Sequence, residues 1–252
     1  MSDTPDARPI AFIAVALVLL LGGGAWWLSR PAKPANASPK IVNATDAPID
    51  KPSAAPPVDL PPLDRMDDFL RPMLSALSSR PELAKWLATD DLVRQLAVAI
   101  DRAAAGGSPS REFKVIAPAT PFKPAGRGDR WTIDPASYRR YDNLVQTVTS
   151  IDASAAARVY KTIRPRLNEA YQGLGHSSGN VDQAVAKTLD ILLDTPVEKD
   201  PVALLEAGGA GWAFADEDLE RLEPTQKQLL RMGSANVERL LVWLRAFRDA
   251  LQ

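Results

Sequence analysis

Cysteine is absent from this 252-residue chain, and histidine occurs once, at His176. Without cysteine there can be no disulfide, no thiolate nucleophile and no cysteine-ligated metal. The single histidine excludes most zinc sites and leaves any Ser-His-Asp triad dependent on His176, whose neighbours Ser177 and Ser178 lack the G-x-S-x-G pattern of a nucleophile elbow. We therefore expect no cofactor, no metal ion and no enzymatic activity.

Excess charge is also missing, because 30 basic and 31 acidic residues leave a net charge of −1. This balance argues against general attraction to nucleic acids. The charge is nevertheless unevenly distributed: residues 111–166 carry 11 basic and 5 acidic side chains, whereas residues 167–223 carry 3 and 12. We expect these two segments to pack against each other, and the alternative is a surface for a charged partner.

An uncharged apolar run of 19 residues extends from Ile10 to Leu28. A helix of that length spans roughly 28 Å, close to the thickness of the hydrocarbon core of a bilayer. Trp26 and Trp27 stand at its end, where indole rings favour the headgroup boundary. The run predicts a single transmembrane helix, and the alternative is a signal peptide cleaved near the small-x-small triplet at 35–37.

The flanking charges and the linker give opposite indications about orientation. Arg30, Lys33 and Lys40 follow the apolar run, whereas the tail before it holds one basic residue, Arg8. The positive-inside rule therefore favours a cytoplasmic C-terminal side. The short tail and the long linker are instead typical of exported single-pass proteins, and on that ground we expect a bacterial inner-membrane protein with a periplasmic soluble domain.

Proline and alanine dominate residues 29–62, and aromatic residues are missing there. Such a segment cannot bury enough apolar surface to fold, and proline biases it towards extended polyproline II. Its full reach is on the order of 100 Å at about 3.1 Å per residue. The expected organisation is an N-terminal tail (1–9), a transmembrane helix (10–28), a linker (29–62) and a helical soluble domain (63–252).

Apolar residues recur at spacings of three and four through most of the domain, which predicts a mostly α fold. Asp134 before Pro135, and Asp152, are expected to cap helices, and residues 180–183 and 225–228 have capping-box patterns. The expected helices cover residues 64–77, 81–88, 89–105, 135–150, 153–172, 181–193 and 234–251. Short strands at 113–116 and 131–133 are expected to pair, as are those at 202–205 and 212–214.

Two acidic clusters, Asp90-Asp91 and residues 216–218, have the composition of a hydrolase pair or a cation site. Both stand at expected helix starts, where capping and the helix macrodipole explain them. The turn at Gly233 is similar to a helix-hairpin-helix, whose amides bind a phosphate. Ala235 replaces the second glycine of that turn, and we favour a plain connection with Gly233 closing one helix and Ser234 capping the next.

Aromatic and basic residues gather at 137–142 and again at 226–231. Arginine beside tyrosine binds carboxylates or phosphates or stacks on sugars, and the same residues also form packing clusters inside folds. We favour the packing interpretation and keep binding as the alternative. The possible binding patch consists of Tyr138, Arg139, Arg140, Tyr141, Gln226, Lys227 and Arg231.

Several longer segments together resemble one bacterial family, the domain of unknown function 3014. They are residues 80–91, 134–142, 169–171, 214–216 and 226–233. The resemblance extends over most of the region from residue 60 to the C-terminus. It implies an N-terminal anchor and a setting in the bacterial envelope, and it implies no activity or catalytic residue.

The function that these observations favour is that of a membrane-anchored envelope protein. Its helical domain would serve as an interaction module for another envelope protein or a cell-wall component. The alternative is a cytoplasm-facing nucleic-acid-binding protein that uses the turn near Gly233. A carboxylate-based hydrolase is the third interpretation.

Overall fold

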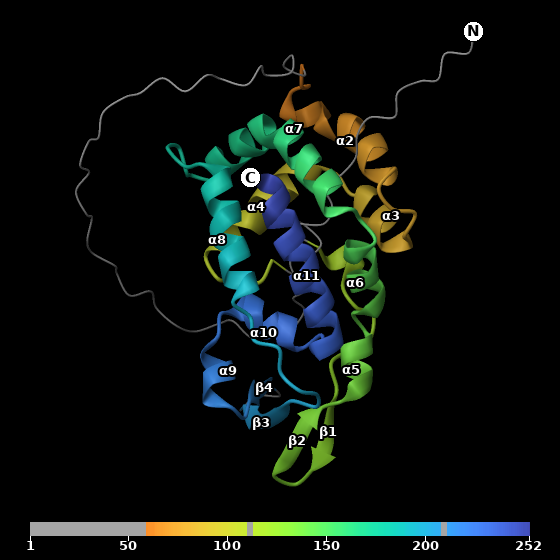
Figure 1. Ribbon diagram of the computed structural model, residues 1–252, viewed down its shortest axis with the longest axis vertical. Helices are drawn as coiled ribbons and strands as arrows, with labels where there is room; N and C mark the ends of the chain where they lie inside the picture. The colour runs from red at the N-terminus through yellow and green to blue at the C-terminus, as the bar shows by residue number, and fades with distance from the viewer. Residues whose placement is uncertain (1–58, 110–112, 208–210) are drawn as a thin grey trace, which may run out of the picture. The chain divides into compact units, whose positions relative to one another are not determined.

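The computed structural model describes residues 59–109, 113–207 and 211–252 (Figure 1). The expected tail at 1–9, the expected transmembrane helix at 10–28 and nearly all of the expected linker at 29–62 lie outside these ranges. None of the helices within them is both long and apolar enough to cross a membrane.

The described residues form a mostly helical domain with a few short antiparallel strands. The helices are η1 (Leu63–Arg65), α2 (Met66–Ser75), α3 (Pro81–Leu87), α4 (Leu92–Ala104), η2 (Lys114–Ile116), α5 (Pro135–Arg139), α6 (Asp142–Thr149), α7 (Ala153–Gln172), α8 (Val181–Leu193), α9 (Glu217–Arg221), α10 (Pro224–Leu230) and α11 (Ser234–Leu251). The strands are β1 (Pro124–Arg127), β2 (Arg130–Ile133), β3 (Ala203–Ala207) and β4 (Gly211–Phe214).

Helix α11 packs against α6, α7 and α8, and α4 packs against α7 and α8 (Figure 1). The face that α11 turns inward carries Leu240, Leu244 and Phe247, each at most 1 % exposed. Their spacing of four and three residues places them along one side of the helix. The main core of the domain therefore follows from the apolar periodicity of its longer helices.

Helix starts follow the local signals at several positions. Asp134 accepts a hydrogen bond from the amide of Ala136, and Asp152 accepts one from Ala155. Asp216 accepts from two amides at the start of α9. These carboxylates fill orphan N–H groups of the first turn, as their sequence context predicts.

The prediction for the start of α4 was wrong in detail. Asp91 has a left-handed backbone, with φ 58°, and its side chain caps nothing. Asp67 of α2 instead accepts from the amides of Asp91 and Leu92, at 2.8 and 2.9 Å. A carboxylate distant in sequence therefore caps this helix.

Two other predicted starts also differ. The capping box of α10 joins Glu223 and Gln226 around Pro224, rather than beginning at Thr225. Ser234 is the first residue of α11, and its position is fixed by hydrogen bonds to Asp200. Proline at the first helical position favours the earlier start of α10, because it has no amide to satisfy.

The single helix expected over 135–150 is two helices, α5 and α6. At the break, Arg140 Nε donates to the carbonyl of Ser137, at 2.9 Å. The amide of Tyr141 then bonds to Tyr138 O, one residue short of the α-helical pattern. The chain turns at this point, which brings Arg140 and Tyr141 to a junction between elements.

The strands form one antiparallel sheet in the order β1-β2-β3-β4. The predicted pairing of 113–116 with 131–133 was wrong, because residues 114–116 form η2 and β2 pairs with β1 across a two-residue turn. Gly128 supplies the positive φ, 64°, that such a turn requires. The predicted pairing of 202–205 with 212–214 is confirmed, and β2 joins the two hairpins through Trp131 and Leu204.

A second, smaller core holds the sheet against α5, α9 and α10. Its buried residues are Ile133, Tyr138, Val202, Leu204, Phe214, Leu219 and Leu230. The main core reaches back to Leu60, which is buried, and Arg166 of α7 donates to the carbonyls of Leu60 and Pro61. The packed domain therefore takes in the last residues of the segment assigned to the linker.

Candidate functional site

Two arginines and three aromatic rings meet where α5, α6, α10 and β4 come together. The guanidinium carbon of Arg140 lies 5.7 Å from the ring centre of Phe122 and 5.0 Å from that of Tyr141. The guanidinium carbon of Arg231 lies 6.0 Å from Phe122 and 5.5 Å from Phe214. These five residues are called the arginine–aromatic cluster, and both cations share the ring of Phe122.

Arg140 is fixed by three hydrogen bonds. Its Nε donates to Ser137 O, one terminal nitrogen donates to Thr120 O at 2.8 Å, and the other donates to Tyr141 Oη at 3.2 Å. Gln228 of α10 donates to the same Tyr141 oxygen at 2.8 Å. The guanidinium of Arg140 is thus held in one orientation by groups from three parts of the chain.

Arg231 is less completely satisfied. It follows α10 directly and is partly buried, and one of its terminal nitrogens donates to the carbonyl of Trp212 at 3.2 Å. Burial lowers the pKa of the Arg231 guanidinium, and the neighbouring charge of Arg140 lowers it further, whereas Tyr141 and Glu220 act in the opposite direction. The fold therefore places a cation where its charge is poorly solvated.

No carboxylate oxygen comes within 4.0 Å of Arg140 or Arg231 in the three described ranges. The nearest ion pair of the neighbourhood joins Lys227 to Glu220 at 2.7 Å. For Arg231, which is partly buried, the carbonyl of Trp212 and the charge of Glu220 offset the lost solvation only in part, since the pKa of its guanidinium is still lowered. The arginine–aromatic cluster consequently carries unbalanced positive charge.

The other residues of the predicted binding patch lie outside the arginine–aromatic cluster. The amide of Val202 donates to Tyr138 Oη at 3.0 Å inside the second core, and burial raises the pKa of the Tyr138 phenol to about 12. Gln226 accepts from the amide of Glu223 in the capping box. Arg139 is exposed. The patch thus divides into Arg140, Tyr141 and Arg231, which belong to the arginine–aromatic cluster, and residues whose contacts serve the fold.

The turn at Gly233 is already occupied. The amide and the hydroxyl of Ser234 both donate to one oxygen of Asp200, each at 3.0 Å. A phosphate bound in the manner of a helix-hairpin-helix needs amides of this kind. A carboxylate of the chain itself fills the position that such a phosphate would take.

The single histidine does not stand free in its loop. His176 Nε2 lies 2.7 Å from Asp101 Oδ1 of α4, and its ring stacks on Tyr171 with the centroids 4.5 Å apart. These contacts join the loop after α7 to α4. Among the residues that the structure describes, no group of three histidine, aspartate or glutamate side chains is placed to hold a metal ion.

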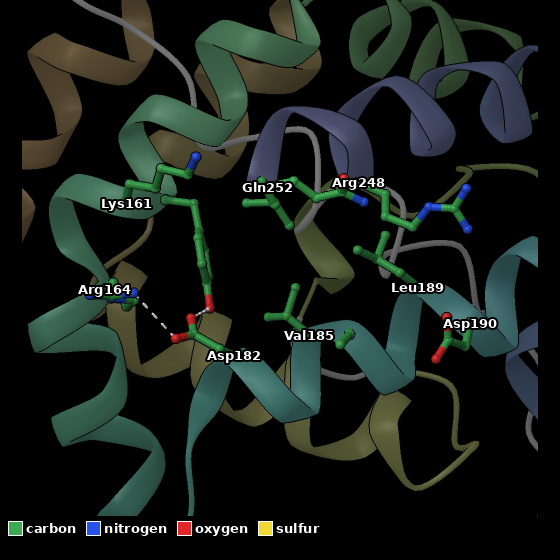
Figure 2. Close-up of a pocket in the computed structure, with 11 residues that line it drawn as sticks. Lys161, Arg164, Asp182, Val185, Leu189, Asp190, Arg248 and Gln252 are labelled. Atoms are coloured by element: carbon green, nitrogen blue, oxygen red, sulfur yellow. Dashed lines mark hydrogen bonds and ion pairs between the residues drawn. The ribbon is translucent and has the colours of Figure 1, made fainter. Parts of the chain in front are cut away.

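A pocket of about 350 Å³ lies between α7, α8 and the end of α11 (Figure 2). Its apolar lining includes Val185, Leu189 and Leu251. Figure 2 shows Lys161 and Arg248 on opposite sides of Gln252. No sequence pattern indicates this pocket, because its residues occupy ordinary positions on three amphipathic helices.

The polar groups of the pocket largely satisfy one another. Asp182 accepts from the hydroxyl of Tyr160 and from Arg164, the latter at 3.4 Å. Lys161 donates to the carbonyl of Ala250 at 3.0 Å. Burial is the main cause that raises the pKa of Tyr160, and Asp182 adds to it. This arrangement suits the packing of three helices.

A family model described as Protein of unknown function (DUF3014) matches residues 92–248. The match includes all five residues of the arginine–aromatic cluster. The chain belongs to this family. The resemblance found in the sequence is therefore confirmed, and membership of DUF3014 assigns no activity to the cluster. Neither a search of curated proteins nor a search of solved structures finds a match.

Sequence reasoning missed Phe122 and Phe214, the aromatic partners of the two arginines. Both occur in segments without a helical period, and Phe122 stands between two prolines, Pro121 and Pro124. No spacing rule links them to Arg140 or Arg231, which are themselves 91 positions apart in number. For this DUF3014 protein, the site is visible because of the fold.

Proposed function

We propose that this protein is held at the bacterial inner membrane by residues 10–28 and that its helical domain binds another envelope protein or a cell-wall component on the periplasmic side. The observation that carries the proposal is the unbalanced positive charge of Arg140 and Arg231 among aromatic rings. Arginine and aromatic residues are enriched where proteins bind partners.

The sequence before the domain supports the tethered arrangement. A 19-residue uncharged run precedes a proline- and alanine-rich segment without aromatic residues. A segment of that composition acts as a spacer, so a domain attached to it would search a volume near the membrane for its partner. Binding through a localised cluster fits such a search.

The disposition of the acidic residues supports binding over hydrolysis. Asp216 and Asp134 cap helices, and Asp67 caps α4 from a distance. Glycoside hydrolysis needs two carboxyl groups held across a substrate, one of them protonated at neutral pH. These three carboxylates instead serve the backbone.

The contact between Ser234 and Asp200 weighs against the nucleic-acid alternative. The nucleic-acid interpretation depends on the turn near Gly233. There the carboxylate of Asp200 occupies the amide of Ser234 and would repel a phosphate. The exposed Glu238 on the next turn of α11 adds a second negative charge.

The test is quantitative capture of partners by the full chain from cross-linked bacterial membranes. The decisive variant replaces Arg140 and Arg231 by methionine, and the control replaces Arg239 and Arg245, both exposed on α11, by methionine. Both variants lose two positive charges. We expect the first to lose the captured partner and the control to keep it; equal capture by both variants would contradict the proposed function.

A further inference from the structure

We infer that Arg231, oriented beside Arg140, binds a single oxyanionic group of the ligand, a carboxylate or a phosphate. The inference rests on the proposed function, since it names the chemistry that the proposed binding site recognises. It follows from the charge of the two arginines, from the hydrogen-bond donors that Arg231 retains and from the aromatic rings around it.

The charge around the two arginines is unbalanced. Three cations lie in this neighbourhood, Arg140, Arg231 and Lys227, and the carboxylate of Glu220 neutralises Lys227. Glu220 is further engaged by the amide of Phe214, which donates to its second oxygen at 2.9 Å. An anion placed against the arginines would supply the missing charge, because opposite charges at contact distance attract strongly where water is scarce.

The hydrogen-bond capacity of the two side chains differs. A guanidinium has five N–H groups. All three nitrogens of Arg140 donate to the acceptors Ser137 O, Thr120 O and Tyr141 Oη, so this residue is anchored. Within the described ranges Arg231 donates to one acceptor, the carbonyl of Trp212. Arg231 therefore retains the donors that a bidentate oxyanion uses, and Arg140 is a positioning residue that adds charge.

The aromatic rings shape what is bound. The guanidinium carbon of Arg231 lies over the rings of Phe122 and Phe214, at 6.0 and 5.5 Å from their centres, and neither ring competes for its N–H groups as a hydrogen-bond acceptor of the oxyanion type. Carboxylate and phosphate oxygens match the N–H edge of a guanidinium with two parallel hydrogen bonds.

An alternative without a ligand is that the arginine–aromatic cluster only fastens the sheet to the helices. The two interpretations predict different effects of replacing Arg231 by methionine on the stability of the ligand-free protein. If Arg231 is kept for a ligand, replacing it by methionine removes an unpaired, partly buried charge while keeping apolar contact with Phe122 and Phe214, and the ligand-free protein loses no stability. If Arg231 is a fastener, the same change destabilises the protein.

The experiment measures thermal unfolding midpoints of the full chain in detergent micelles. Inorganic phosphate and acetate are titrated separately, and chloride keeps the ionic strength constant. Arg231→Met is compared with the wild type and with Arg239→Met, a control on the exposed side of α11. Salts of either kind shift the unfolding midpoint of every variant gradually as their concentration rises. The effect of specific binding is therefore the saturable part of the plot of midpoint against oxyanion concentration.

We expect the unfolding midpoint of the wild type and of Arg239→Met to rise saturably with phosphate or acetate. The midpoint of Arg231→Met should show no saturable rise. We also expect the midpoint of Arg231→Met without oxyanion to be at least that of the wild type. The salt that saturates at the lower concentration distinguishes a phosphoryl ligand from a carboxylate. A wild type without saturation, or a variant that keeps it, overturns the inference.

If Arg231→Met does not fold, the wild type alone decides the question. Phenylglyoxal modifies accessible arginines, and mass spectrometry compares Arg231 with Arg239 in the same molecule. At an oxyanion concentration about ten times the Kd, modification of Arg231 should slow about tenfold while Arg239 is unchanged. Equal rates with and without oxyanion overturn the inference. A saturable effect together with failed partner capture would refute the proposed function and leave the oxyanion site standing.

Discussion

Replacement of Leu244 by alanine tests whether the apolar stripe of α11 is core. Leu244 is fully buried, and its helix packs against α6, α7 and α8. Truncation removes buried methyl groups and leaves a cavity that three surrounding helices cannot easily close. The expected loss in the free energy of unfolding is about 2–5 kcal/mol. In a domain of this size, that loss lowers the unfolding midpoint by roughly 4–20 °C.

The same helix supplies a matched control two residues away. Val242 is 65 % exposed, so Val242→Ala removes methyl groups that are already in water. Its expected effect lies within about 0.5 kcal/mol of zero. Both variants share the helix and the replacement residue, and the two positions are two residues apart. The difference between them therefore isolates burial.

The assay is urea unfolding of residues 59–252, followed by circular dichroism and tryptophan fluorescence. The free energy is obtained from the midpoint and slope of each curve, and equal slopes show that the same surface is exposed in each case. If Leu244→Ala costs no more than Val242→Ala, the inner face of α11 is not core. The stripe would then have to be reassigned as a partner-binding surface.

Three further predictions concern topology, independence and one tyrosine. A reporter active only in the periplasm should be active when fused after Gln252, and a reporter active only in the cytoplasm should not; the reverse result would contradict the periplasmic placement. Residues 59–252 should be soluble, mostly helical by circular dichroism and cooperative in unfolding, since Leu60 already packs on the core; aggregation would mean that another part completes the core. Tyr138→Phe should cost about 1–3 kcal/mol, because the buried amide of Val202 loses its acceptor, and unchanged stability would contradict this. Burial raises the pKa of Tyr138 from 10.0 to about 12, so wild-type stability should fall as pH rises between those values, and more than in Tyr138→Phe.

The helical part of the fold was predictable because its signals are local. Apolar residues recur at helical spacing along α7, α8 and α11, and a polar residue such as Asp152 precedes a first turn whose amides need an acceptor. These features act over a few residues and do not depend on the rest of the chain. The hairpin of β3 and β4 was predictable for the same reason.

The sheet as a whole was decided by tertiary structure. Trp131 of β2 and Leu204 of β3 pair across a separation that includes α5, α6, α7 and α8. Strand pairing at such a distance leaves no spacing pattern in the sequence. The same holds for the cap of α4, where Asp67 takes the place that the adjacent Asp91 was expected to fill.

The candidate site shows most clearly which properties depend on the sequence alone and which depend on the tertiary structure. Composition alone marked Arg140, Tyr141 and Arg231 as residues able to bind an anion or to pack. The bend between α5 and α6 and the end of α10 bring the two arginines to one ring, Phe122. Whether a cation is neutralised depends on which carboxylates the fold places within a few ångströms, and Glu220 is placed on Lys227. The sequence determined which chemical groups were present, and the tertiary structure decided which charges were left without a partner.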